Sequence, residues 1–290
     1  MKWYEKYLSV YGKPYAGVPA EVMDGIRNRL RTLQSDEPLV SVVVIAYNEE
    51  KHLPACLWSL SESVCEYPME IIGVNNDSAD RTADVFEASG IPYHTELQHS
   101  CGYARRCGLQ YAQGKYYICI DSDTMYPPGY VQAMADALQR PGIVAVSSLW
   151  SYMPDEGHPW LGLKIYEFMR DTHLWMQSFK RPELSVRGLV FAYNADYGRK
   201  VGYRVDIIRG EDGSMALGLK QYGRIGFVRS RKARAVTGYG TVGADGSFLN
   251  SFRARLLPMF MLPSSLPFIG CLTATRSPSG SLTPSGFWMA

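Results

Sequence analysis

The sequence has 290 residues, of which 46% are hydrophobic and 20% charged, so it can bury a sizeable core and is not a disordered chain. The net charge is only +2, which excludes the large positive excess of proteins that coat nucleic acids. No apolar run is long enough to span a bilayer, and the N-terminus lacks the apolar core of a secretory signal. We therefore expect a cytoplasmic protein with no nucleic-acid partner, whose six cysteines are reduced.

The near-neutral total conceals an uneven distribution of charge. Residues 199–255 hold 12 Lys and Arg against 4 Asp and Glu, whereas the rest of the chain is acidic. A basic stretch of this kind is either a solvated surface or a site for an anion, such as a phosphate or an anionic membrane surface.

The first half of the chain alternates between two kinds of hydrophobic pattern. A helix is expected over residues 20–34, followed by a buried, β-branched strand over 39–46 and a helix that Asn48 would cap. Strands and helices then alternate, with strands expected at 69–74, 92–96, 116–120 and 142–149 and helices at 82–88, 101–112 and 128–139. This alternation predicts an α/β fold: one Rossmann-like, doubly wound, mostly parallel sheet with flanking helices in a single domain.

After residue 150 the pattern is less regular. We expect an aromatic-rich amphipathic helix at 158–179, a strand at 188–193, a helix at 210–222 and a strand at 224–229. Residues 256–290 form an apolar, low-complexity tail with Arg276 as their single charged residue. Its composition is compatible with disorder, with packing on the domain or with contact with a membrane.

Three polar clusters follow predicted strands, at residues 47–50, 75–80 and 121–123. Because ligands bind at the carboxyl ends of parallel strands, we expect these clusters to converge on one site. Asp121 and Asp123 are spaced so that an extended backbone would point both carboxylates the same way, as a site for Mg²⁺ or Mn²⁺ requires. The alternative interpretation is a turn with two solvated acids.

Other charged residues have local alternatives as well. Arg105 and Arg106 lie near the start of a predicted helix, where an arginine reaches a phosphate or simply lies on the surface. Glu211 and Asp212 begin a later helix, as dipole partners or as a general base facing a metal–phosphate site. The G-x-G-x-x-G run at 238–243 has no acidic residue about 20 positions later, so we do not interpret it as a dinucleotide loop.

Five segments, taken together in chain order, resemble the motifs of family 2 glycosyltransferases, which have the GT-A fold. The segments are VSVVVIAYNEE at 40–50, EIIGVNNDSADRT at 70–82, GYARRCG at 102–108 with AQGKY at 112–116, DSD at 121–123, and GED at 210–212 with LKQYG at 219–223. The resemblance covers about residues 39–230. It implies an N-terminal helical lead at 1–37 and a GT-A domain at 38–255, with a nucleotide-binding half at about 38–125 and an acceptor half at about 126–255.

The resemblance also implies an activity, the inverting transfer of a sugar from a nucleoside-diphosphate sugar to an acceptor hydroxyl. By this resemblance, Ala46 and Glu49 border the nucleoside, and Asn75 or Asn76 contacts the base. Arg105 holds the base or diphosphate, and Asp121 with Ser122 contacts the nucleotide sugar. Asp123 with Asp121 binds Mn²⁺ or Mg²⁺, and Asp212, beside Glu211, deprotonates the acceptor. A divalent ion would neutralise the charge of the departing diphosphate.

The expected setting follows from the same resemblance. The Gln-x-x-Arg-Trp motif of processive members is absent, which favours the addition of one sugar, with a UDP-sugar as the first candidate donor. The acceptor would be a saccharide or a lipid-linked molecule in cell-surface polysaccharide or glycolipid synthesis, with peripheral association at the inner membrane face. The alternatives are a nucleotidyltransferase acting on sugar phosphates and a non-catalytic nucleotide-sugar binder.

Overall fold

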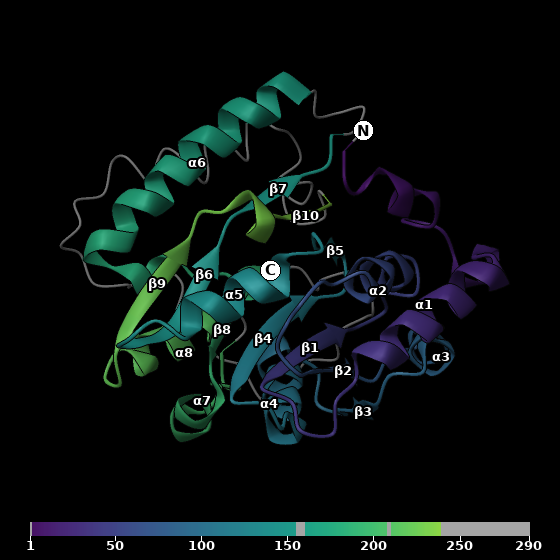
Figure 1. Ribbon diagram of the computed structural model, residues 1–290, viewed down its shortest axis with the longest axis horizontal. Coiled ribbons are helices and arrows are strands. Elements are labelled where there is room, and N and C mark those ends of the chain that lie inside the picture. Colours follow the sequence, from purple (N-terminus) through teal and green to yellow (C-terminus); the bar gives the residue numbers. More distant parts are fainter. Residues whose placement is uncertain (1, 155–159, 208–209, 239–290) are drawn as a thin grey trace, which may run out of the picture.

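A computed structural model describes residues 2–154, 160–207 and 210–238 (Figure 1). The tail at 256–290 and most of the glycine-rich run at 238–243 therefore lie outside the described residues. The α-helices are α1 Ala20–Leu33, α2 Leu53–Ser61, α3 Thr82–Ser89, α4 Cys101–Tyr111, α5 Tyr130–Leu138, α6 Trp160–Lys180, α7 Ala195–Val201 and α8 Glu211–Leu219. Short 3₁₀ turns are η1 Glu5–Ser9, η2 Tyr15–Gly17, η3 Pro182–Ser185, η4 Gly188–Val190 and η5 Arg231–Ala233.

A seven-stranded sheet with the order β3-β2-β1-β4-β8-β6-β9 forms the centre of the described structure. Its strands are β1 Val40–Ala46, β2 Met69–Asn75, β3 Tyr93–Thr95, β4 Tyr116–Asp121, β6 Ile143–Ser148, β8 Phe191–Asn194 and β9 Arg224–Val228. All neighbours pair in parallel except β8, which is antiparallel to both β4 and β6. The expected α/β fold with a mostly parallel sheet is confirmed.

Alternate residues of the buried strands face different helices. Val42 and Val44 of β1 pack in one cluster with α1, α2, α3 and α5, whereas Val43 and Ile45 pack in a second cluster with α4, α7 and α8. This follows from the two-residue period of a strand, and it explains why the segment reads as a continuous apolar run. Burying each such aliphatic side chain contributes about 1.5–3 kcal/mol.

Several elements differ from the expectations. A second sheet, β5-β10-β7, is built from β5 Thr124–Met125, β7 Trp150–Tyr152 and β10 Ala235–Thr237, which are too short to show a hydrophobic period. The expected strand at 188–193 begins with the turn η4, and the helix expected at 210–222 ends at Leu219. Among the described residues, no helix combines the length and the apolar character that crossing a bilayer requires.

The N-terminal lead packs against the sheet domain. α1 contacts α2 and α3, and the hydroxyl of Tyr7 in η1 donates to Glu62 Oε2 at 2.8 Å, just beyond α2 (Figure 1). Tyr7 and Val10 share a buried cluster with Ala55 and Met125. The lead therefore contributes to the same body as the segments that carry the predicted site.

Candidate active site

The loops after β1 and β2 are joined by hydrogen bonds at the carboxyl edge of the sheet. Asn48 does not cap a helix as expected: its φ of 55° is left-handed, and α2 begins later, at Leu53. Its side-chain Oδ1 instead accepts from the backbone N–H of Ala79 at 2.8 Å. The Glu50 N–H donates to Asp80 Oδ2 at 3.0 Å, which adds a second bond between the two loops. The expected convergence of these loops is therefore present.

Asn75 ends β2 and Asn76 follows it, and both side chains form hydrogen bonds within the protein. Asn75 Oδ1 accepts from the Ser78 N–H at 3.1 Å. Asn76 Nδ2 donates to the carbonyls of Glu96 and Gln98, both at 2.8 Å, and its Oδ1 accepts from the Ser100 N–H at 3.2 Å. Asn76 is buried, so it holds the loop that precedes α4 against β2, and its amide is already used by these bonds.

Glu49 lies at the start of the same edge, where the N-terminal lead reaches it. The His52 Nδ1 is 2.7 Å from Glu49 Oε2, and the rings of Tyr11 and His52 are 4.7 Å apart. The Tyr11 hydroxyl donates to the backbone carbonyl of Asp123 at 3.0 Å. Ala46, the last residue of β1, is buried beside this loop.

Asp121, Ser122 and Asp123 do not lie on one extended strand. β4 ends at Asp121, and the next two residues make a turn before β5, with the Ser122 side chain buried. The expectation of carboxylates aligned along a strand was therefore wrong, but the turn still keeps the carboxylates close enough to interact. Burial, with the negative charges of Glu49 and Asp121, raises the pKa of Asp123 to about 7.

Arg105 of α4 connects the two acidic segments of the site. Its Nη2 donates to Asp121 Oδ1 at 2.5 Å, and its Nε lies 3.5 Å from Asp212 Oδ1. The Arg105 side chain is only 2% exposed, whereas the neighbouring Arg106 is exposed and lies over the Tyr103 ring. One guanidinium thus holds carboxylates from the end of β4 and from the start of α8.

Two glycines let α4 approach closely enough to place this guanidinium. A Cβ at Gly108 would lie 2.4 Å from Val43 Cγ1 in β1, and a Cβ at Gly102 would lie 2.5 Å from the carbonyl oxygen of Arg204. Real Cβ atoms do not come so near, so both positions require glycine. Ser100 begins the helix by accepting a hydrogen bond from the Tyr103 N–H at 3.1 Å.

Glu211 and Asp212 occupy the first turn of α8, as expected. Burial raises the pKa of Asp212 to about 7; the Arg105 guanidinium opposes this shift and Glu211 adds to it. Burial also raises the pKa of Glu211. A carboxyl group with a pKa near neutrality is suited to accept a proton during a reaction.

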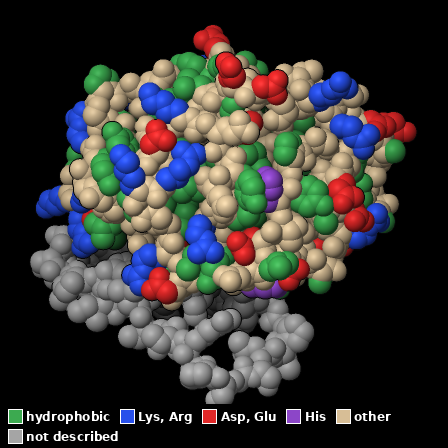
Figure 2. Space-filling view, turned by 90° about the horizontal axis from the view of Figure 1, so that it is seen from below, with side chains coloured by type: hydrophobic (Ala, Val, Ile, Leu, Met, Phe, Trp, Pro, Cys, Tyr) green, Lys and Arg blue, Asp and Glu red, His purple; other side chains and the backbone are tan. Residues whose placement is uncertain are grey.

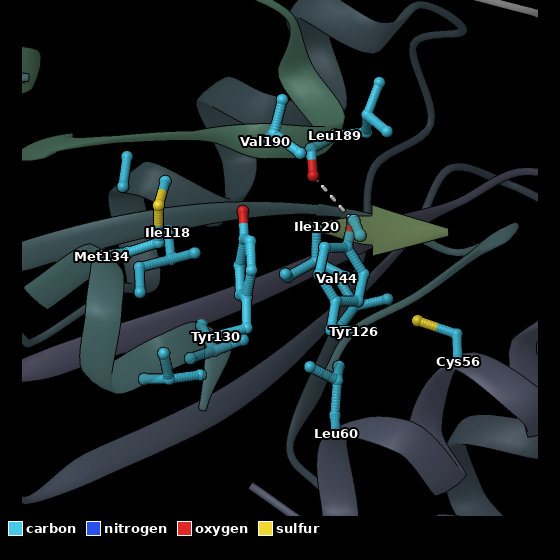
Figure 3. Packing of buried hydrophobic residues seen from close by; sticks show 14 of the residues in the cluster. Val44, Cys56, Leu60, Ile118, Ile120, Tyr126, Tyr130, Met134, Leu189 and Val190 are labelled. Carbon is cyan, nitrogen blue, oxygen red and sulfur yellow. Dashed lines mark hydrogen bonds between the residues drawn. The ribbon is translucent and has the colours of Figure 1, made fainter. Parts of the chain in front are cut away.

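The turn η4 covers this ion-paired group from the other side. The Tyr126 hydroxyl donates to the Leu189 carbonyl at 2.9 Å (Figure 3). It also accepts from the Asp121 N–H at 3.2 Å, so one buried tyrosine holds both the end of β4 and the turn. Gly188 in the turn lies directly over the ion pair: a Cβ there would be 2.3 Å from both Arg105 Nη2 and Asp212 Oδ2.

We expect Gly188→Ala to disrupt the site. The added methyl group has no space, so Arg105 and Asp212 must separate or the turn must shift, at a cost of roughly 1–3 kcal/mol of stability. The measurements are the thermal unfolding midpoint and the rate of sugar transfer. Gly213→Ala in α8 is the matched control, because its nearest neighbour would be a carbonyl at 3.8 Å; equal effects of the two substitutions would contradict this packing argument.

A divalent cation fits the chemistry of the acidic residues. Asp123 accepts from the Thr124 hydroxyl at 2.9 Å, but among the described residues no Lys or Arg forms an ion pair with it. A cation would relieve the repulsion that raises its pKa. Within the described ranges no three His, Cys, Asp or Glu side chains are grouped to hold a metal. Asp121 and Asp123 would therefore supply only part of the ligand set.

The structure thus brings Glu49, Asp121 and Asp123 to one edge and joins Asp121 to Asp212 through Arg105. Sequence reasoning did not identify Tyr11, Tyr126 or Gly188. The sequence carries no signal for them, because a tyrosine in a helical lead or a single glycine before a strand becomes important only through contacts between distant segments.

Comparisons with known proteins place the chain in a family. The model of the family described as Glycosyl transferase family 2 matches residues 41–198, which is more than half of the chain. The putative glycosyltransferase EpsH of Bacillus subtilis is 34% identical over 105 residues, covering 34% of this chain and 30% of its own. The match spans about a third of the length of the first curated relatives.

Solved structures of low sequence identity share the fold. The mannosyltransferase PcManGT of Pyrobaculum calidifontis, in complex with GDP-Man and Mn²⁺, has a TM-score of 0.53 at 16% identity and covers 82% of this chain and 73% of its own. Glucosyl-3-phosphoglycerate synthase from Mycobacterium tuberculosis, in complex with Mn²⁺, UDP and phosphoglyceric acid, has a TM-score of 0.53 at 19% identity and covers 84% of each chain. The family match and this GT-A architecture show that the chain belongs to glycosyltransferase family 2.

Proposed function

We propose that the protein is an inverting glycosyltransferase that transfers one sugar from a nucleoside-diphosphate sugar to an acceptor hydroxyl. A UDP-sugar is the first candidate donor, and the acceptor is a saccharide or a lipid-linked molecule of cell-surface polysaccharide or glycolipid synthesis. The observation that carries the proposal is the joint hold of Arg105 on Asp121 and Asp212, which sets a candidate base beside the acidic edge. Relatives of the same fold bind GDP-Man or UDP.

In the proposed reaction Asp212 accepts the proton of the acceptor hydroxyl. The acceptor oxygen forms a bond to the anomeric carbon as the bond from that carbon to the diphosphate breaks, so the configuration inverts in one step. Arg105 acts as a positioning residue, because its guanidinium lies within ion-pair distance of the Asp212 carboxylate and attracts it. Glu211 lies beside the base and favours proton uptake through its negative charge.

The acidic edge would hold the donor. Asp123 and Asp121 would bind Mn²⁺ or Mg²⁺, which supplies charge neutralisation to the diphosphate leaving group when bound. The residues that would border the nucleotide lie at or support the same carboxyl edge of the sheet; they are Ala46, Glu49, Asn75, Asn76 and Ser122. Of these, Asn76 would act through the loop it holds, since its amide is already hydrogen-bonded.

The donor site is tested by ligand-induced stabilisation. Uridine, guanosine and thymidine diphosphates, each with Mn²⁺, are compared for the rise in unfolding temperature that they cause, because a ligand stabilises the state it binds. We expect one of them to stabilise the protein in a Mn²⁺-dependent way and Asp123→Asn to abolish that dependence. Incubation with the matching nucleotide sugars then measures nucleotide release and transfer. Full Mn²⁺ dependence in Asp123→Asn would contradict the assigned metal ligand.

The pH dependence of transfer follows from the state of Asp212. The base works only when deprotonated, and its pKa is raised to about 7, so kcat/KM should rise about tenfold per pH unit up to that pH and then level off. The profile is measured at saturating Mn²⁺ and corrected for donor binding. A flat profile between about pH 5 and pH 8 would contradict the role of Asp212 as the base.

A further inference from the structure

Helix α6 is apolar on two opposite faces. Leu163, Tyr166 and Leu174 point into the core, as in any surface helix of a globular protein. The opposite face is also apolar but exposed: Phe168 is 73% and Phe179 68% accessible. Figure 1 shows α6 along one edge of the molecule, where no other described helix covers its outer side.

The exposed residues form one continuous stripe. Leu161, Ile165, Phe168, Trp175 and Phe179 recur at intervals of three, four or seven residues, which places them on a single helix face. At 1.5 Å per residue the stripe is about 27 Å long. Thr172, within the stripe, donates its hydroxyl to the Phe168 carbonyl at 2.8 Å, so the hydrogen-bonding capacity of this donor is already used within the helix.

Outside α6, the exposed large apolar side chains of the described residues lie on separate elements; they are Leu8, Val64, Leu97, Tyr111 and Leu217. Figure 2 shows the side near α4 and α7, where charged side chains of both signs are interspersed with small apolar groups. Single exposed apolar residues such as Val64 and Leu97 are ordinary on soluble proteins, whereas a contiguous aromatic stripe marks an interaction surface.

The charges that border the stripe are basic. The acidic residues of α6 are turned inward: Glu167 accepts from the Tyr152 N–H at 2.8 Å, and Asp171 pairs with Arg170 and Arg234. Lys180 is exposed near the C-terminal end of the helix. Lys164, near the other end, is half exposed, and its Nζ pairs with Glu167 Oε2 at 2.9 Å. Arg229, the residue after β9, lies over the Trp175 ring, 5.5 Å from its centroid.

We propose that this α6 stripe binds the surface of an anionic phospholipid bilayer. An in-plane helix inserts Trp, Phe and Leu side chains at the boundary between headgroups and acyl chains, while Lys and Arg meet the anionic headgroups. A second copy of the chain is a poorer fit, because a twofold contact through the stripe would bring Lys164, Lys180 and Arg229 of two copies together. An uncharged apolar partner would leave the basic border without complementary charge.

The position of α6 gives the contact a role in the proposed reaction. The helix leads directly into η3 and then into η4, whose Gly188 lies over Arg105 and Asp212. η3 also packs against α8, the helix that carries Asp212. Contact of α6 with a membrane would therefore be linked, through η3 and η4, to the turn that lies over the candidate base.

The test is co-sedimentation of the full chain with vesicles of phosphatidylcholine alone or of phosphatidylcholine with phosphatidylglycerol. We expect binding to the anionic vesicles to be tighter by on the order of tenfold or more, as three basic residues near the surface predict. The double variant Phe168→Asp, Phe179→Asp should lose at least about tenfold of that binding. Val64→Asp is the matched control, since Val64 is equally exposed but lies beyond α2, and it should bind as the unmodified chain does.

The remaining outcomes would overturn the proposal. They are no binding to either vesicle, equal binding to both vesicles, loss of binding in Val64→Asp, or a dimer that sedimentation velocity finds in the unmodified chain and that the double variant abolishes. Circular dichroism and the diphosphate-induced rise in unfolding temperature confirm that the variants are folded. The binding assay contains no donor or acceptor, so its failure is distinguishable from a failure of the proposed transfer activity.

Discussion

Replacing Asp212 by Asn should lower the kcat of sugar transfer by roughly 10³-fold, because an amide cannot accept the acceptor proton and general-base catalysis contributes about 10²–10⁴-fold. The substitution keeps the size of the side chain beside Arg105. We therefore expect the nucleoside diphosphate with Mn²⁺ to stabilise the variant as it stabilises the unmodified protein. Single-turnover transfer and thermal shift, measured on the same preparation, separate the loss of chemistry from a loss of binding.

Asp206→Asn is the matched control for this substitution. Asp206 lies shortly before α8 and forms an exposed ion pair with Arg204, which contributes little to stability, so its kcat should stay within about twofold of the unmodified value. Transfer by Asp212→Asn at a rate comparable to the control would exclude Asp212 as the base. Loss of diphosphate binding in Asp212→Asn would instead assign the residue to the donor site.

Replacing Arg105 by Met should give the largest loss of stability. The guanidinium is buried against the carboxylates of Asp121 and Asp212, and removing one partner of a buried pair leaves uncompensated charge, at a cost of about 3–5 kcal/mol. Transfer should also fall, because Asp212 loses the contact that orients it. Denaturant unfolding measures the loss of stability. The residual activity is analysed separately for kcat and KM, and a fall in kcat is the effect expected of a residue that positions the base.

Arg106→Met serves as the control on the adjacent position of the same helix. Arg106 is exposed and lies over the Tyr103 ring, an interaction of about 0.5–1 kcal/mol at an exposed site. The loss of stability in Arg106→Met should therefore be several times smaller than in Arg105→Met. Lys at position 105 keeps the charge but not the forked donor geometry, so Arg105→Lys should recover part of the stability and less of the activity. Equal losses at the two positions would contradict the ion-pair argument.

The sequence predicts the regular part of the fold well because burial imposes a period. The β1 segment reads as a strand since both of its faces are covered by helices, and α4 begins where Ser100 caps it. The antiparallel direction of β8 and the small β5-β10-β7 sheet could not be predicted, because a short strand has no pattern that reveals its direction or partner.

The structure brings several of the predicted site residues together, but it arranges them in a way that the sequence did not predict. Strand-end polarity pointed to Asp121 and Asp123, and the start of a predicted helix pointed to Asp212. Nothing in the sequence indicated that Arg105 would be buried between Asp121 and Asp212. The extended arrangement assumed for residues 121–123 was wrong because β4 ends at Asp121 and the chain turns. Roles that depend on the pairing of distant segments, such as those of Tyr126 and Gly188, become visible only in three dimensions.

The contact of Tyr11 with Asp123 joins two segments that are far apart in the chain. The Tyr11 hydroxyl bonds to the Asp123 carbonyl and also lies against Gly238, so the acidic edge is enclosed by the first and the last described segments. Until residue 238 has emerged from the ribosome, a nascent chain lacks the contact between Gly238 and Tyr11. The candidate donor site would therefore be complete only after residue 238 has been synthesised, and contacts so distant along the chain make folding slow relative to local helix formation. Nucleotide captured by the finished site would then report on the integrity of the whole described fold.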